Sequence, residues 1–410
     1  MIVNSPLPFQ KRSFIVTLGL LTGMAAFTVD VSLPAVPAMV EALATNLSKG
    51  QQIVGIFMAG MAFGQIPAGL ISDRIGRLPV LYVGMSLFAI AATIAAFAND
   101  IQLMLSARFL QGFGAASAIV LSRAIVRDIA TGKEAAKLMS LMTMIFTAAP
   151  VIAPSIGALL VARWGWRAPF IVIAICGFLI VMAIRSNITE THTPAVGQHP
   201  VRQLLSSISE FFSHRQSIFG LLLVVLPPAG FMSIIAVAAA LVVEIYGYSV
   251  TAFGLIFATA GISILAGSFI NRLLVTRMDG LHLIALGVAL YGISSVQLLI
   301  MAWMNQAPLL WLWSCVCAFM LAVAIVMPNA IVLALDPMPK IAGVASSIIG
   351  TLQNIFGAAG ALCVAVIYDG SVRNCILIMG ALGTLTVVVF VARPWIAPDI
   401  IHHPDELARD

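Results

Sequence analysis

Long apolar segments follow one another along almost the whole chain, and they constrain its fold more than any other feature. A bilayer core is about 30 Å thick, so a helix needs about 20 mostly apolar residues to cross it. The sequence contains twelve such windows, at 14–40, 52–72, 78–98, 101–126, 138–162, 167–185, 218–243, 253–274, 281–303, 308–335, 342–368 and 374–393. Windows this long satisfy their own backbone polar groups as helices, which excludes barrel strands. We therefore expect an all-α membrane protein with twelve transmembrane helices.

The composition excludes several other classes of protein. Hydrophobic residues make up 61% of the chain and charged residues only 9%, whereas soluble domains carry about 25% charged residues. The net charge of +5 comes from basic residues spread singly over many loops, so nucleic acid is not an expected partner. Five cysteines without metal-ligand spacing predict no disulfide framework and no metal site. The chain also contains no GxxxxGK[ST] phosphate loop, which argues against direct use of ATP.

Lysine and arginine predict the orientation in the membrane. If the N-terminus is cytoplasmic, the opposite side receives only Lys49, Arg163, Arg167 and Arg373, and most other basic residues fall on the cytoplasmic side. The positive-inside rule favours this arrangement. An even number of spans then places both termini in the cytoplasm, and we expect a multi-pass protein of the inner (plasma) membrane.

The longest polar interruption divides the spans into two sets of six. The predicted domains are an N-terminal six-helix bundle, a cytoplasmic linker loop, a C-terminal six-helix bundle and a cytoplasmic tail, at 1–185, 186–217, 218–396 and 397–410. Within the linker, 204–212 could form a short helix on the membrane surface. The two sets also echo each other, because "GLISDRIGR" follows the second span and "GSFINRLLVTR" follows the eighth. Two similar six-helix bundles related by pseudo-symmetry, with a cavity between them, are typical of secondary transporters.

Several motifs resemble those of one family. "GLISDRIGRLPVL" (69–81) resembles the signature that the major facilitator superfamily carries between helices 2 and 3, and "RFLQGFGAA" (108–116) resembles the helix 4 motif of its proton-coupled members. "APSIGA" (153–158) is similar to the helix 5 motif of drug:proton antiporters. "DVSLPAVP" (30–37) and 328–350 are similar to the bicyclomycin and chloramphenicol resistance branch. The resemblance implies the major facilitator fold and proton-coupled drug export.

Asp30 is the most unusual residue of the first span. It lies sixteen residues into the window, about 24 Å from the cytoplasmic end of a helix that rises 1.5 Å per residue. An ionised carboxylate there costs about 2.5–3.5 kcal/mol, so it must face a cavity, find a partner or take up a proton. We expect Asp30 to carry a proton and to meet substrate. A permanent ion pair or an interhelical hydrogen bond is the alternative.

Arg108, in the first third of the fourth span, is the candidate opposing charge. Arginine stays charged at any relevant pH, so it can favour ionisation of a nearby carboxylate. Gln111 lies one helical turn away and can share its hydrogen bonds. The resemblance also implies a coupling role for this arginine. The alternative is that Arg108 extends outward to the lipid headgroups.

The segment after the second span predicts a tight cytoplasmic turn, in which Gly76 can adopt a positive φ. By resemblance, Asp73, Arg77 and Asp128 form a charge cluster that latches the two halves in the outward-facing state. The alternative for the arginines is that they only fix topology. The predicted latch comprises Gly69, Asp73, Arg74, Gly76, Arg77 and Asp128.

The fifth span carries Pro150, Pro154 and Gly157. Prolines kink a helix and glycine lets a neighbouring helix pack closely, so a bend here could open or close one end of a cavity. An ordinary kink without directional meaning is the alternative, and the inference to antiport depends on the resemblance.

These observations predict a transporter that exports drugs or other amphipathic small molecules in exchange for protons. Export of a native metabolite such as a siderophore or sugar, import of a nutrient by proton symport, and a scaffold without transport are the alternatives. The expected partners are a small-molecule substrate, protons and the lipid bilayer, and we expect a monomer that is not an enzyme and has no cofactor. The sequence leaves open the roles of Arg123, Glu244 and Asp336.

Overall fold

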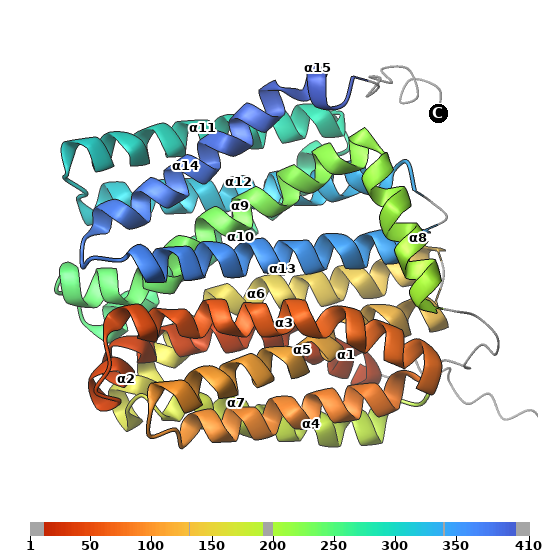
Figure 1. Cartoon of the computed structure of the whole chain (residues 1–410), viewed down its shortest axis with the longest axis horizontal. Helices are drawn as coiled ribbons and strands as arrows, with labels where there is room; N and C mark the ends of the chain where they lie inside the picture. The colour runs from red at the N-terminus through yellow and green to blue at the C-terminus, as the bar shows by residue number, and fades with distance from the viewer. Residues whose placement is uncertain (1–11, 131, 192–199, 339–340, 399–410) are drawn as a thin grey trace, which may run out of the picture. The chain divides into compact units, whose positions relative to one another are not determined.

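The computed structural model describes residues 12–130, 132–191, 200–338 and 341–398, and these ranges contain helices and no strand (Figure 1). Among the described residues, eleven helices are long and apolar enough to cross a membrane. The remaining expected span, 138–162, falls within α6, whose apolar part Val151–Trp164 is shorter. The prediction of an all-α chain is confirmed.

The helices follow the expected windows closely. In chain order they are α1 (Arg12–Ser32), η2 (Leu33–Ala35), α2 (Val36–Ala42), α3 (Leu47–Ile75), α4 (Arg77–Ala96), α5 (Ile101–Ile129), α6 (Gly132–Trp164), α7 (Ala168–Asn187), α8 (Pro200–Ser213), α9 (Arg215–Ala240), η3 (Leu241–Ile245), α10 (Val250–Leu274), α11 (Gly280–Met304), α12 (Leu309–Leu335), α13 (Ala342–Ile367), α14 (Val372–Val391) and α15 (Arg393–Ile396). The element η2 is a 3₁₀ turn and η3 is a π-helical turn.

The first expected span is helical throughout, but a 3₁₀ turn interrupts its α-helix. Pro34 lies in the first turn of η2 and Pro37 in the first turn of α2, so α1 ends at Ser32. Proline has no backbone N–H, and the i→i−4 pattern of an α-helix would pair residue 34 with the carbonyl of Asp30. Position 34 therefore donates no hydrogen bond to the carbonyl of Asp30. Asp30 occupies the last turn of α1.

The chain forms two compact units. Unit 1 comprises Met1–Pro200, Ile235–Gly261 and Ala361–Val366, and unit 2 comprises Val201–Ile234, Ile262–Gly360 and Ile367–Asp410. The predicted boundaries near 185 and 218 stay a prediction.

Small residues set the helix packing inside unit 1. Helix α3 packs along α5, and the backbones come so close that a methyl group on Gly60 would meet the carbonyl of Phe109. A methyl group on Gly112 would likewise meet the carbonyl of Phe57. Helix α4 packs against α5 and α7, and α1 packs against α6. Close approach through glycine is the usual way in which membrane helices gain packing energy.

Unit 2 is organised around α11, which packs against α12 and α14. In unit 2, Asn271 stands at the position that corresponds to Asp73, and Asn329 Nδ2 donates to Asn271 Oδ1 over 2.7 Å. A helix also forms at the expected surface segment, as α8. In α8, Phe211 is buried while Leu205 and Phe212 are exposed.

Candidate functional site

The Asp30 side chain is buried in unit 1, with 5% of its surface exposed. No hydrogen bond or ion pair joins its carboxyl group to any residue that the structure describes. Nearby in the chain, Thr28 Oγ1 is also buried without a partner. The described residues therefore contain no permanent ion pair of Asp30.

Arg108 is fully buried in unit 1, so it does not extend to the lipid headgroups. Its guanidinium lies 4.5 Å from the ring centre of Phe57 and 5.9 Å from that of Phe170. Nη1 donates to Gln111 Oε1 over 2.8 Å, and Nε donates to the carbonyl of Ile53 over 3.3 Å. Nη2 is buried without a hydrogen-bond partner in the described part of the chain. A desolvated contact between a cation and an aromatic ring contributes about 2 kcal/mol.

The structure brings Arg108 and Gln111 together, but it does not pair Arg108 with Asp30. A hydrogen bond of 3.2 Å between the hydroxyls of Thr22 and Ser122 fixes the register of α1 against α5. At 1.5 Å per residue, Asp30 lies about 12 Å beyond this contact, Gln111 about 17 Å and Arg108 about 21 Å. Gln111 thus lies between the levels of the carboxylate and the guanidinium.

Sequence reasoning missed Gln51, which belongs to the same part of unit 1. This residue is fully buried, and neither its amide nitrogen nor its amide oxygen has a hydrogen-bond partner among the described residues. It lies two positions before Ile53, whose carbonyl accepts a bond from Arg108. The only signal in the sequence was an amide at the edge of an apolar window.

The expected charge cluster forms around Arg77 in unit 1. Arg77 is buried, with 7% exposure, and its Nη1 forms an ion pair with Asp73. Nε donates to Asp128 Oδ2 over 3.1 Å, and Nη1 also donates to Ser72 Oγ over 2.8 Å. The ends of α3 and α5 are therefore joined through one guanidinium at the start of α4.

Of the predicted latch set, Gly69, Arg74 and Gly76 do not take part in these contacts. Arg74 is exposed and forms no ion pair with the described residues, and its role in the latch stays a prediction. Gly69 is half-buried, and an added methyl group would meet only Val120 Cγ1 at 3.7 Å, an ordinary contact. Gly76, by contrast, has a φ of +102°, as the predicted turn requires.

The helix 5 motif lies in α6, where Pro154 and Gly157 are buried. The side chain of Pro150 lies outside the described ones. Gly157 faces the backbone of Val31 in α1, one residue after Asp30. Within unit 1, Ser155 Oγ donates to the carbonyl of Gly254 over 3.1 Å. The motif thus contacts the last turn of α1, which contains Asp30, and the start of α10.

Gly157→Ala is expected to destabilise the protein. The added methyl group would overlap the carbonyl oxygen of Val31, so α1 and α6 would have to separate, and such overpacking costs about 1–3 kcal/mol. The midpoint of thermal unfolding of the detergent-purified variant should fall. Gly69→Ala is the matched control, since its methyl group has room and alanine favours helix. An equal effect of the two substitutions would contradict the packing argument.

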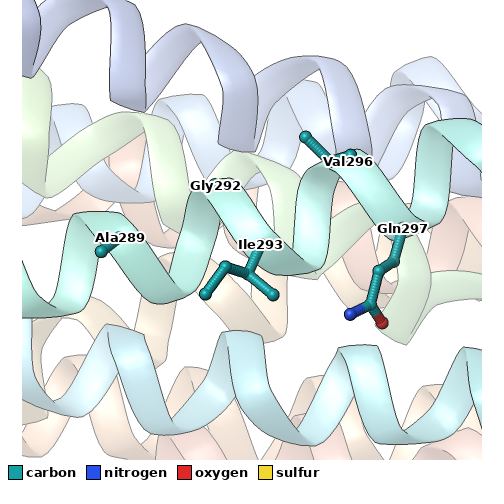
Figure 2. A pocket seen from close by; sticks show the side chains of 5 residues that line it. All are labelled: Ala289, Gly292, Ile293, Val296 and Gln297. Atoms are coloured by element: carbon teal, nitrogen blue, oxygen red, sulfur yellow. The ribbon is translucent and has the colours of Figure 1, made fainter.

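None of the contacts described above includes the three residues left open in the sequence. Arg123 is exposed, and Glu244 lies in the π-helical turn η3. Asp336 accepts a hydrogen bond of 3.3 Å from Gln216 Nε2. A pocket in unit 2 follows α11 (Figure 2) and is lined by Ala289, Gly292, Ile293, Val296 and Gln297. Gln297 is its one polar side chain, and its Oε1 accepts from Trp311 Nε1 over 3.1 Å.

Comparison with known proteins identifies the family. Residues 18–361 match the model of the Major Facilitator Superfamily. The chain belongs to this superfamily. It is 28% identical over 389 residues to the bicyclomycin resistance protein homolog of Haemophilus influenzae, covering 93% of this chain and 96% of that protein. It is 29% identical over 383 residues to the multidrug resistance protein MdtL of Escherichia coli, covering 92% and 95%.

A solved structure supports the same fold. The xylose transporter XylE from E. coli, in a partially occluded inward-open conformation, matches with a TM-score of 0.71 at 16% identity, covering 93% of this chain and 96% of that one. This major facilitator protein is therefore a twelve-helix membrane transporter and not an enzyme. The resemblance to the drug:proton antiporter group is confirmed.

Proposed function

We propose that this transporter exports drugs or other amphipathic small molecules from the cytoplasm in exchange for external protons. The names of two relatives, a bicyclomycin resistance protein homolog and a multidrug resistance protein, support drug export. The similarity to XylE is too low to carry a substrate, so sugar transport gains nothing from it.

The observation that carries the proposal is a buried carboxyl group and a buried guanidinium that share unit 1 without forming an ion pair. Asp30 has no partner among the described residues, and Arg108 is held by Gln111 and the carbonyl of Ile53. A buried charge without a counter-charge is costly, so Asp30 is most stable here when it carries a proton. When it loses that proton, Arg108 is its natural partner.

This exchange of partners couples proton movement to conformation. In the protonated arrangement Arg108 stays with Gln111, and in the ionised arrangement it moves toward Asp30. Such a switch changes the contacts of α1 with α5, and α1 also packs on α6 through Gly157. A protein with two arrangements whose balance depends on protonation can use a proton gradient to alternate its access. The Arg77 cluster and the Ser155 contact are the proposed latches of this movement.

The proposed transporter works as a monomer with both termini in the cytoplasm. We place both termini in the cytoplasm because the basic residues gather on that side under the positive-inside rule. One copy contains Asp30, Arg108 and the Arg77 cluster in a single unit, so a monomer is sufficient for coupling. Nucleic acid has no part in this scheme.

Proteoliposomes with an imposed pH gradient test the function, with ethidium and labelled chloramphenicol as probes. A 1:1 exchange of protons for a neutral solute can yield about 1.4 kcal/mol, or about tenfold accumulation, per pH unit. Antiport predicts that chloramphenicol accumulates in the acidic compartment and that a protonophore abolishes this accumulation. Accumulation in the alkaline compartment would indicate symport, and absence of any protein-dependent flux of either probe would support a scaffold.

A further inference from the structure

Glu190 follows α7 in the chain, and its side chain contacts the start of α4. Its Oε1 accepts a hydrogen bond of 2.9 Å from the backbone N–H of Arg77, and its Oε2 accepts one of 2.9 Å from the N–H of Leu78. The first N–H groups of a helix have no partner within the helix, and a carboxylate there is also favoured by the helix dipole. The exposed Glu190 side chain therefore caps α4, although Glu190 lies 113 positions after Arg77 in the sequence.

Gly76 makes room for this cap. An added methyl group at Gly76 would lie 2.6 Å from Glu190 Oε2, which is closer than real contacts allow. The positive φ of +102° at the same residue turns the chain out of α3 and into α4. Glycine is thus required at position 76 because the backbone has a positive φ there and because the Glu190 carboxylate leaves no room for a side chain.

The segment that carries Glu190 also touches the charge cluster. Thr191 Oγ1 donates to Asp128 Oδ2 over 3.2 Å, and the same oxygen accepts from Arg77 Nε over 3.1 Å. Two consecutive residues therefore hold the backbone of Arg77 and one of its two carboxylate partners.

We propose that Glu190 is a positioning residue of the latch. By capping α4, it fixes the point from which the Arg77 side chain reaches Asp73 and Asp128, and it makes the first residues after α7 a working part of the latch. This inference rests on the proposed function, in which the Arg77 cluster controls the change of conformation. The start of the predicted linker thus positions the latch in addition to connecting the two sets of spans.

Amide hydrogen exchange tests the cap without any transport assay. In purified full-length protein, Glu190→Ala should accelerate exchange at Arg77 and Leu78 by about fivefold, the order expected for loss of a helix cap, and leave the centre of α4 unchanged. Glu190→Gln should have a smaller effect, because its amide oxygen still accepts one bond. Thr189→Ala is the control, since Thr189 is an exposed neighbour. Unchanged exchange in Glu190→Ala would overturn the inference.

Transport kinetics then test the positioning role. Ethidium turnover by Glu190→Ala should fall about tenfold while its KM changes less than about twofold, because a latch affects conformational steps more than binding. In an Arg77→Ala background, Glu190→Ala should cause no further loss, since it acts through Arg77. Normal turnover in the single variant, or a full additional loss in the double variant, would overturn the inference. Normal turnover in Arg77→Ala alone would instead count against the latch in the proposed function, while amide exchange would still decide the cap.

Discussion

Asp30→Asn is expected to abolish proton-driven accumulation of substrate while preserving the folded protein. The amide has nearly the same shape as the carboxyl group but cannot exchange a proton. Asp30 has no ion-pair partner among the described residues, so its replacement leaves no buried cation newly unpaired. The accumulation of chloramphenicol along a pH gradient, about tenfold per pH unit for 1:1 exchange, should disappear. Counterflow of chloramphenicol without a gradient should persist.

A matched variant separates loss of the proton carrier from loss of any carboxylate. Glu41→Gln makes the same chemical change in α2, on an exposed residue for which the described structure contains no ion pair. It should retain full accumulation. Thermal unfolding of both variants should match that of the unmodified protein. Uphill flux that survives unchanged in Asp30→Asn would remove Asp30 from the coupling mechanism.

Asp73→Ala is expected to slow turnover about tenfold or more while the KM for ethidium changes less than about twofold. The substitution removes the ion pair with Arg77 Nη1 and leaves Asp128 as the remaining carboxylate partner of that arginine. Substrate affinity should change little, because Asp128 of the cluster lies about 30 Å from Arg108 along α5 at 1.5 Å per residue. Initial rates at graded ethidium concentrations measure both quantities.

The control for Asp73→Ala removes another exposed carboxylate on the predicted cytoplasmic side. Glu210→Ala in α8 serves this purpose, because the described part of the chain gives Glu210 no ion pair. Its turnover should be normal. A rise in KM with unchanged turnover in Asp73→Ala would show a binding role and contradict the latch.

Hydropathy predicted the helices well because lipid imposes one length and one polarity on every span. The window 78–98 corresponds to α4 (Arg77–Ala96), and the window 374–393 corresponds to α14 (Val372–Val391). The 3₁₀ turn after Ser32 was missed although Pro34 is in the sequence, since hydropathy does not register a missing N–H.

The site was predictable where contacts are local in sequence and unpredictable where they are not. Arg108 and Gln111 are one turn apart, so helix geometry alone anticipated their contact. The separation of Arg108 from Asp30 depends on the register of two packed helices, which no motif encodes. Glu190 was missed for the same reason, because its partners lie more than a hundred positions away.

The central claim is that the Asp30 carboxyl group gains and loses a proton within the working cycle. Infrared difference spectroscopy of the purified protein, titrated through neutral pH, tests it most directly. The account predicts a band of a buried protonated carboxyl group that disappears as the pH rises, that is absent from Asp30→Asn and that responds to ethidium. An Asp30 carboxylate that stays ionised throughout the titration, with and without ethidium, would contradict the account.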